Sequence, residues 1–105
     1  MSFKLRFIQR FRAENEEAFM DLEKQFAELE KNNPAFPEGK RFRPYIGREP
    51  TNTLIWECDF PSMNEVTAAL QVIEASSDHD ALLEKAKDIA FYEDGYVEIY
   101  KSVDP

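Results

Sequence analysis

The side chains able to do chemistry are few, and the first is the single histidine of the chain, His79. It stands in Ser76-Ser77-Asp78-His79-Asp80, a pattern typical of the start of a helix. A histidine that acts as a general base needs a substrate proton within reach and a neighbour that orients its ring. Asp78 and Asp80 are too close in sequence to be assured of that orienting role. His79 is therefore a weak catalytic candidate, with a structural or surface role as the alternative.

The single tryptophan and the single cysteine, Trp56 and Cys58, share the stretch 53–60. Alternation of apolar and polar residues along this stretch predicts a strand with one apolar face. Trp56 either lines a ligand pocket between sheet and helix, which makes it the second weak catalytic candidate, or packs in the core. Cys58 is expected to be a small buried apolar residue. One His and one Cys on different elements do not predict a metal site.

A larger polar group is expected on the other face of the same sheet. Its members are titratable or hydroxyl-bearing: Arg6, Arg10, Tyr45, Glu57, Asp59, Glu98 and Tyr100. Basic residues of the first strand stand beside acids of the strands expected to flank it, and opposite charges across a ladder attract. Titratable groups gathered on a half-buried face often mark a site, although structural ion pairs have the same composition. The sequence predicts either a polar ligand pocket or a dimer-interface network here.

The elements that must position these residues alternate in type along the chain. Strands are predicted over 3–12, 41–48, 53–60 and 96–101, and helices over 14–31, 62–75 and 78–91. This β-α-β-β-α-β order, with the second helical segment in two pieces, predicts a four-stranded antiparallel sheet with helices on one side. The fold class is therefore a ferredoxin-like α+β sandwich, with the first and third strands in its centre. The whole chain, 1–105, is expected to form one domain.

Several boundaries follow from single residues. Pro44 cannot donate to a ladder, so the second strand should lie at an edge. Ser62 is expected to cap the second helix and Ser77 the third. Glu93-Asp94-Gly95 is expected to be a turn.

The sheet face that carries the polar group also contains apolar side chains, namely Ile8, Ile55, Tyr96 and Tyr100. Exposure to solvent explains the charges on this face but does not explain the isoleucines and tyrosines. A face half covered by a second sheet explains both. We therefore expect the chain to form a homodimer through its sheets.

Composition excludes several classes of function. The net charge of −8 disfavours nucleic-acid binding, which needs a contiguous basic surface. No segment approaches the ~18 apolar residues of a membrane span, no signal peptide is apparent, and a single cysteine excludes an internal disulfide. A cytoplasmic protein without membrane or nucleic-acid partners is expected. Lys40, Arg41, Arg43 and Arg48 form a basic loop that either is solvated or grips a carboxylate or phosphate.

Two motifs together with the element order resemble those of the dimeric α+β barrel superfamily. They are the strand end Trp56-Glu57-Cys58-Asp59-Phe60-Pro61-Ser62 and the helix break Ile73-Glu74-Ala75-Ser76-Ser77-Asp78-His79. The nearest relatives by this resemblance are NIPSNAP-like proteins and the antibiotic-biosynthesis-monooxygenase group. The resemblance covers essentially the whole chain.

The resemblance implies a pair of ferredoxin-like subunits packed sheet against sheet, with ligands between sheet and helices or inside the barrel. Some members of the superfamily are cofactor-free oxygenases and others degrade haem. Lys85 or Lys87 stands roughly where the haem-degrading relatives have their axial histidine, so no haem or other cofactor is expected. Two functions remain: a small-molecule-binding or accessory protein, or a cofactor-independent monooxygenase-like enzyme acting on an aromatic or polyketide-like substrate. The enzyme hypothesis predicts a closed apolar cavity near Trp56 with a convergent polar group.

Overall fold

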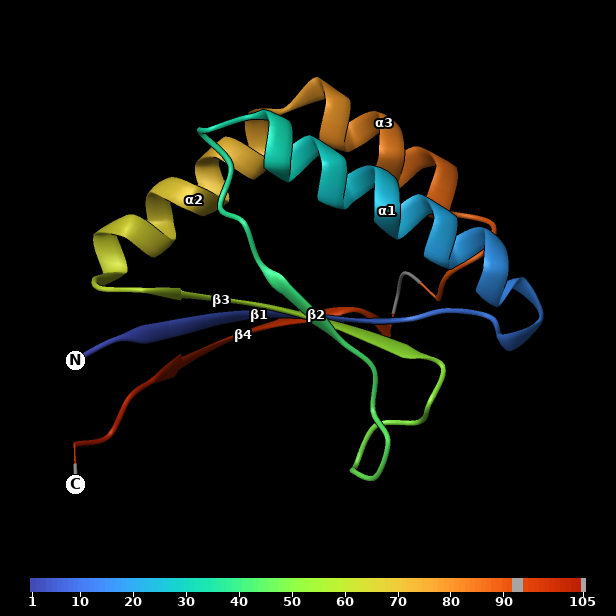
Figure 1. Ribbon diagram of the computed structural model, residues 1–105, viewed down its shortest axis with the longest axis horizontal. Helices are drawn as coiled ribbons and strands as arrows, with labels where there is room; N and C mark the ends of the chain where they lie inside the picture. Colours follow the sequence, from blue (N-terminus) through green and yellow to red (C-terminus); the bar gives the residue numbers. More distant parts are fainter. Residues whose placement is uncertain (92–93, 105) are drawn as a thin grey trace.

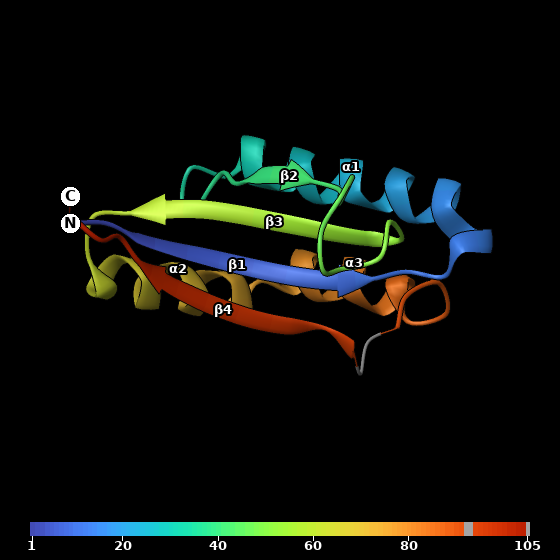
Figure 2. The ribbon, with the colours of Figure 1, turned by 90° about the horizontal axis from the view of Figure 1, so that it is seen from below.

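A four-stranded antiparallel sheet carries a single layer of helices on one of its faces (Figures 1 and 2). The computed structural model describes residues 1–91 and 94–104. The strands are β1 (Phe3–Arg10), β2 (Lys40–Phe42), β3 (Thr53–Phe60) and β4 (Tyr96–Lys101). The helices are η1 (Ala13–Asn15), α1 (Glu16–Asn32), α2 (Met63–Ala75) and α3 (Ser77–Ala86). The predicted ferredoxin-like α+β arrangement is confirmed.

The order of strands in the sheet is β2-β3-β1-β4, so the first and third strands are central as predicted. β1 pairs with β3 along its whole length, from Phe3 opposite Phe60 to Arg10 opposite Thr53. This register places Phe7 opposite Trp56 and Arg6 opposite Glu57, on opposite faces of the sheet. The apolar row therefore faces the helices, and the charged row faces away from them.

Capping serines fix where two of the helices begin. The Ser62 side chain accepts a hydrogen bond from the Glu65 backbone N–H at 3.3 Å, as predicted for α2. For α3 the prediction was one residue late, because the cap is Ser76, which accepts from the His79 N–H at 3.1 Å. Ser76 also ends α2, so this one extended residue separates the two helices.

Other boundaries differ from the expectation at the ends of elements. The first strand ends at Arg10 rather than at residue 12, and a 3-10 turn precedes α1. The last helix ends at Ala86 rather than at residue 91. Of the predicted turn Glu93-Asp94-Gly95, the first residue lies outside the described residues.

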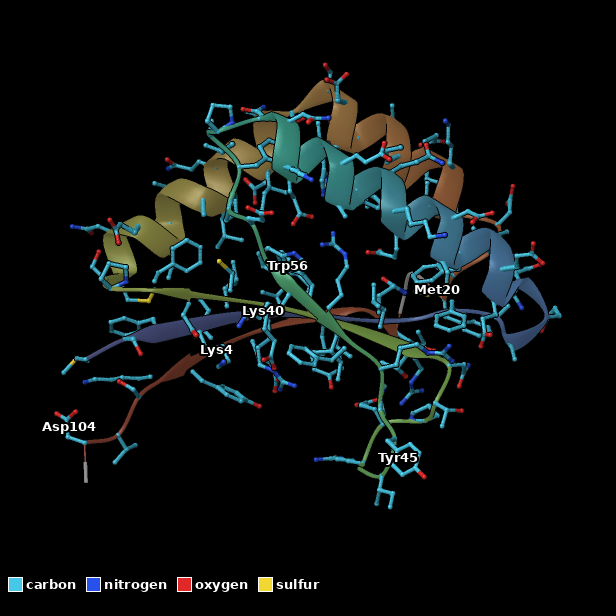
Figure 3. All side chains as sticks on the ribbon, in the orientation of Figure 1. Lys4, Met20, Lys40, Tyr45, Trp56 and Asp104 are labelled. Carbon is cyan, nitrogen blue, oxygen red and sulfur yellow. The ribbon has the colours of Figure 1, made fainter. Side chains whose placement is uncertain are left out.

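The second strand is much shorter than predicted, because only Lys40–Phe42 pair with β3. Arg43 and Pro44 leave the ladder, since a proline has no N–H to donate. The chain between β2 and β3 then turns to the face opposite the helices, and Tyr45 stands at its tip (Figures 1 and 3).

The helices do not cover the sheet evenly. α2 lies close to β1 and β3, whereas α1 packs on α3 and has no Cα atom within 8 Å of a strand. β4 is left largely bare, and Val97, which shares the helix-side face with Phe7, is 54% exposed. Ile99 on the same strand is exposed too. The stand-off of α1 leaves space between the layers.

Candidate ligand-binding site

A cavity of about 440 Å³ lies between the sheet and the helix layer. It is bounded by all three long helices and by the inner face of β1 and β3. Most of its wall is aromatic or aliphatic, including Phe7, Phe19, Phe26, Phe36, Trp56 and Leu70. An apolar space near Trp56, as the enzyme hypothesis required, is therefore present, but it is partly open to the surface rather than closed.

Trp56 forms part of the floor of this cavity and points from β3 toward the helices (Figure 3). Its ring stacks on that of Phe7, with centroids 5.1 Å apart. Its indole N–H donates to Oε1 of Glu30 at 3.1 Å. Trp56 thus joins the apolar wall of the cavity to a polar group, as well as packing in the core.

The polar group consists of Glu23 and Glu30 from α1 and Arg41 from β2. Arg41 Nε donates to Glu23 Oε2 at 2.9 Å, and its two terminal nitrogens donate to the two oxygens of Glu30. All three side chains line the cavity and are largely buried. The register places Arg41 opposite Trp56, on the helix side of the sheet. For Arg41 the alternative of a solvated loop was therefore wrong.

Glu23 differs from an ordinary surface glutamate. Burial raises the pKa of its carboxyl above the usual value of 4.5, against the opposing effect of Arg41. Nearby Glu30 adds to the upward shift of this pKa by charge repulsion. Glu23 therefore binds a proton more readily than a solvated glutamate, although Arg41 is beside it.

His79 also lines the cavity, with its ring 5.0 Å from the ring of Phe26 and 6.3 Å from that of Phe36. Burial lowers the pKa of His79, and Asp80 and Glu30 partly oppose the shift. The imidazole is therefore neutral at neutral pH and able to accept a proton. Among the described residues no side chain hydrogen-bonds the ring, so the orienting neighbour that a general base needs is absent from this part of the chain.

Cys58 is half-buried at the end of β3, and burial raises the pKa of its thiol. Its sulfur lies 3.7 Å from the carbonyl oxygen of Glu38. A thiol with a raised pKa is a poor nucleophile at neutral pH. These features agree with the expected structural role.

On the opposite face, the structure assembles part of the predicted polar group around Arg6. Arg6 donates to Glu57 at 2.7 Å, to Glu98 at 2.9 Å and to the Tyr100 hydroxyl at 3.0 Å. Lys4 extends this network to Asp59 at 3.3 Å. These side chains satisfy one another within a single chain, and a role for them in a ligand pocket or a dimer interface stays a prediction.

Two members of the predicted group lie elsewhere. Arg10 was expected to face Glu57 and Asp59, but it stands opposite Thr53 and pairs with Glu49 at 3.2 Å. Tyr45 is 91% exposed at the tip of the β2–β3 connection (Figure 3). Arg10 lies at the Thr53 end of the β1–β3 pairing, away from Glu57 and Asp59, whereas Tyr45 lies on the connection that leaves the sheet after Phe42.

The same connection accounts for a buried residue on this face. Ile8 is only 2% exposed although its side chain faces away from the helices. Glu49 of the connection binds both Arg10 and the Tyr96 hydroxyl, which is 2.7 Å away, and so holds the connection against this end of the sheet. A second sheet is therefore not needed to cover Ile8. Tyr96 and Tyr100 stay exposed on this face, and Tyr45 and Ile46 are exposed on the connection.

Glu23 and Glu30 were not among the functional candidates predicted from the sequence. Both lie on the inner stripe of α1, where Phe19, Glu23, Phe26 and Glu30 follow one another at spacings of four, three and four. Glutamates placed inside an apolar helical stripe are a signal, because a charge on a buried face needs a partner. The partner, Arg41, comes from a strand whose register the sequence did not reveal.

Neither a metal-holding group of side chains nor a membrane-spanning helix is found in the described residues. No group of three or more His, Cys, Asp or Glu side chains in residues 1–91 and 94–104 is placed to hold a metal ion. None of the helices in that part of the chain has the length and apolar character needed to cross a membrane.

The arrangement of sheet and helix layer is that of small ferredoxin-like α+β proteins with known structures. A NIPSNAP family protein from Agrobacterium tumefaciens strain C58 superposes with a TM-score of 0.77 at 14% identity, over 99% of this chain and 95% of that one. An uncharacterised NIPSNAP-like domain protein from Burkholderia xenovorans gives 0.76 at 12% identity, over 97% and 85% of the chains. An antibiotic biosynthesis monooxygenase gives 0.72 at 16% identity, over 97% and 99%.

These likenesses confirm, at the level of the fold, the resemblance to NIPSNAP-like and antibiotic-biosynthesis-monooxygenase-like proteins. No protein-family model and no curated protein matches the sequence. At identities this low the likeness establishes the fold, and the activity has to be argued from the site.

Proposed function

We propose that this protein binds a small, mainly apolar organic molecule in the cavity between its sheet and its helices. The observation that carries the proposal is the cavity of about 440 Å³, a size within the range of about 300–1,000 Å³ common for ligand pockets. Protein interiors are otherwise closely packed, and empty space in a core costs stability. A ligand of matching shape restores the missing contacts.

The walls of the cavity favour an aromatic ligand. Phe7, Phe19, Phe26 and Trp56 present ring faces and edges from both layers. Aromatic rings gain from offset stacking and edge-to-face contacts beyond the area that they bury. The neighbouring NIPSNAP-like structures support the proposal through the shared fold alone.

The test uses Trp56 as the reporter, because it is the only tryptophan and lines the cavity. An uncharged apolar dye such as Nile red should quench its fluorescence and raise the thermal midpoint of the protein. Ile73→Phe adds volume inside the cavity and should abolish both effects. The matched control Gln71→Phe lies on the exposed side of the same helix and should leave both unchanged. Dye binding that survives Ile73→Phe, or no binding at all, would falsify the proposal.

A second candidate is a cofactor-independent monooxygenase-like enzyme acting on an aromatic or polyketide-like substrate. The specific support is the aromatic cavity beside Trp56 with Glu23, Arg41 and a neutral His79 in its wall. The fold is also that of an antibiotic biosynthesis monooxygenase. Oxygen uptake measured with a phenolic anthrone and no added cofactor tests it. The enzyme should accelerate uptake and His79→Gln should reduce the acceleration; a rate equal to that without protein contradicts this candidate.

We also infer that the chain forms a homodimer through the sheet face opposite the helices. Tyr96 and Tyr100 are exposed on that face, and Tyr45 projects beyond it from the β2–β3 connection, with the exposed Ile46 next to it in the chain. Exposed apolar side chains gathered on one face favour an interface over solvent. A second copy of this chain is the partner that the sheet geometry fits, since two such faces can pack on each other.

A further inference from the structure

The two glutamates at the polar end of the cavity share one arginine. Glu23 and Glu30 both pair with Arg41, and the third acid in the wall, Glu74, has no cation of its own among the lining residues. Arg41 is the only lysine or arginine that lines the described cavity. The polar end therefore carries an excess of negative charge.

The hydrogen bonds of the two glutamates are unequal. Oε1 of Glu30 accepts from the Gly39 N–H, from Arg41 and from Trp56, while its Oε2 accepts from Arg41 as well. Glu23 accepts a single hydrogen bond, from Arg41 Nε to its Oε2. Within residues 1–91 and 94–104, no donor reaches Oε1 of Glu23. Both oxygens of Glu30 are thus hydrogen-bonded within the protein, whereas Oε1 of Glu23 is available to a ligand at the cavity wall.

We propose that Glu23 receives the polar head of the ligand, and that this head is a hydrogen-bond donor, a phenol or a protonated amine, on an aromatic body. The inference rests on the proposed function of the cavity and names the class of ligand that it takes. Arg41 and Glu30 act as the fixed support that holds Glu23 in place.

The charges and hydrogen bonds of this cluster favour a ligand that donates a hydrogen bond over a ligand that carries a negative charge. Each of the three nitrogens of Arg41 already donates to a glutamate, and its single positive charge is shared by two carboxylates, so a ligand carboxylate gains little from it. It would also meet the charge of Glu23 and Glu30 at close range, which is unfavourable in a largely buried site. A donor head meets an available carboxylate oxygen instead. Hydrogen bonds to a charged acceptor are among the stronger ones in proteins.

The test compares four ligands with the same two-ring body: naphthol, naphthylmethylamine, naphthoate and naphthalene. Binding is measured by calorimetry and by quenching of Trp56 at neutral pH. The phenol and the amine should bind at least about tenfold more tightly than naphthalene, as expected for one hydrogen bond to a buried charge. Naphthoate should bind most weakly. Equal affinities for the four, or a preference for naphthoate, overturn the proposal.

Variants test whether Glu23 causes the preference for ligands that donate a hydrogen bond. Glu23→Gln should reduce the affinity for naphthol and naphthylmethylamine by about tenfold and leave that for naphthalene unchanged. Arg41 retains both of its bonds to Glu30 in this variant, so the cavity should persist. Glu28→Gln makes the same chemical change at an exposed position of the same helix and should have no effect. An unchanged donor preference in Glu23→Gln overturns the role of Glu23.

The outcomes distinguish this inference from the function on which it rests. Failure of Nile red and of all four naphthalenes to bind rejects the cavity as a ligand site. A protein that binds the dye but does not favour the two donors remains a cavity-binding protein, and only the role given to Glu23 falls. The ligand series on the unaltered protein decides this even if a variant does not fold.

Discussion

Two arginines each bind two glutamates, and they lie on opposite faces of the sheet. Arg6 joins Glu57 to Glu98 across three strands on the face away from the helices. Arg41 joins Glu23 to Glu30 on the helix side, at the wall of the cavity. The first cluster links neighbouring strands, whereas the second places charges beside an apolar space.

Removal of the charge should have different effects at the two cavity glutamates. Glu30→Gln disrupts four hydrogen bonds in a largely buried place and should lower the free energy of unfolding by about 1–3 kcal/mol. Glu23→Gln should cost less, because the raised pKa of Glu23 means that its ionised form is favoured less in the folded than in the unfolded chain. Urea denaturation at neutral pH measures both. A larger loss for Glu23→Gln than for Glu30→Gln would contradict this ranking.

The single histidine should make stability depend on pH in a defined window. The pKa of His79 is lowered in the folded chain, so the unfolded chain binds this proton more readily. The stabilisation is complete above the unfolded pKa of about 6.5 and is lost as the pH falls through the folded pKa.

His79→Phe keeps the ring contacts with Phe26 and Phe36 but cannot titrate. Urea denaturation at pH values of about 7.5 and 5.5, on either side of the free histidine pKa, should show a smaller loss in this variant than in the unaltered protein. Equal losses in the two proteins would show that His79 does not set the dependence.

At the scale of the element, the short strand β2 organises the cavity. Its three residues place Arg41 opposite Trp56, and the segment just before it brings Gly39 against the indole ring. A Cβ atom on Gly39 would lie only 2.0 Å from Trp56 Cε2 and 2.2 Å from its Nε1. The absence of a side chain at Gly39 therefore allows Trp56 to reach Glu30.

Gly39→Ala should force the indole ring to move and weaken its bond to Glu30. Overpacking of this kind typically costs about 1–3 kcal/mol, and the displaced ring should change the fluorescence of Trp56. Gly47→Ala is the matched control, because a Cβ there meets nothing within 4 Å. Denaturation followed by fluorescence measures both variants, and equal stability of the two would refute the close-contact argument.

At the scale of the whole molecule, the layers are unevenly matched. Three helices cover the centre of the sheet and one of its edges, while β4 and the tip of the β2–β3 connection remain bare (Figure 2). Tyr45 and Ile46 are about as exposed as side chains can be, at 91% and 90%. A partner surface is the simplest reason for two large apolar side chains to stand there.

Replacement of these two residues should weaken the proposed homodimer. The double change Tyr45→Asp and Ile46→Asp should raise the dissociation constant by at least about tenfold, the effect of leaving one large side chain unburied. Val103→Asp, at an equally exposed apolar residue near the C-terminus, should have no effect. Sedimentation equilibrium at micromolar concentration gives the mass. A lone species at the chain mass of 12.3 kDa in the unaltered protein rejects the dimer.

The sequence by itself determined the order of the elements and the centre of the sheet. Period-two alternation over 53–60 predicted β3 to the residue, and the three-and-four spacing of Phe19, Leu22 and Phe26 marks the buried face of α1. Both are local patterns that any buried strand or helix must show. The caps and breaks near Ser62 and Ser76 were likewise local, and the prediction missed only by one residue at the second.

Only the tertiary structure decided which charges meet. The pairing of Arg41 with Glu23 and Glu30 depends on the register of a three-residue edge strand, which no periodicity specifies. The pairing of Arg10 with Glu49 and the position of Tyr45 depend on a connection that leaves the sheet after Phe42 and folds across its far face. The cavity arises because α1 rests on α3 rather than on the strands, and that distance is set by packing between segments far apart in the chain. A sequence pattern names the face on which a side chain lies, but the separation of two faces is a property of the assembled layers.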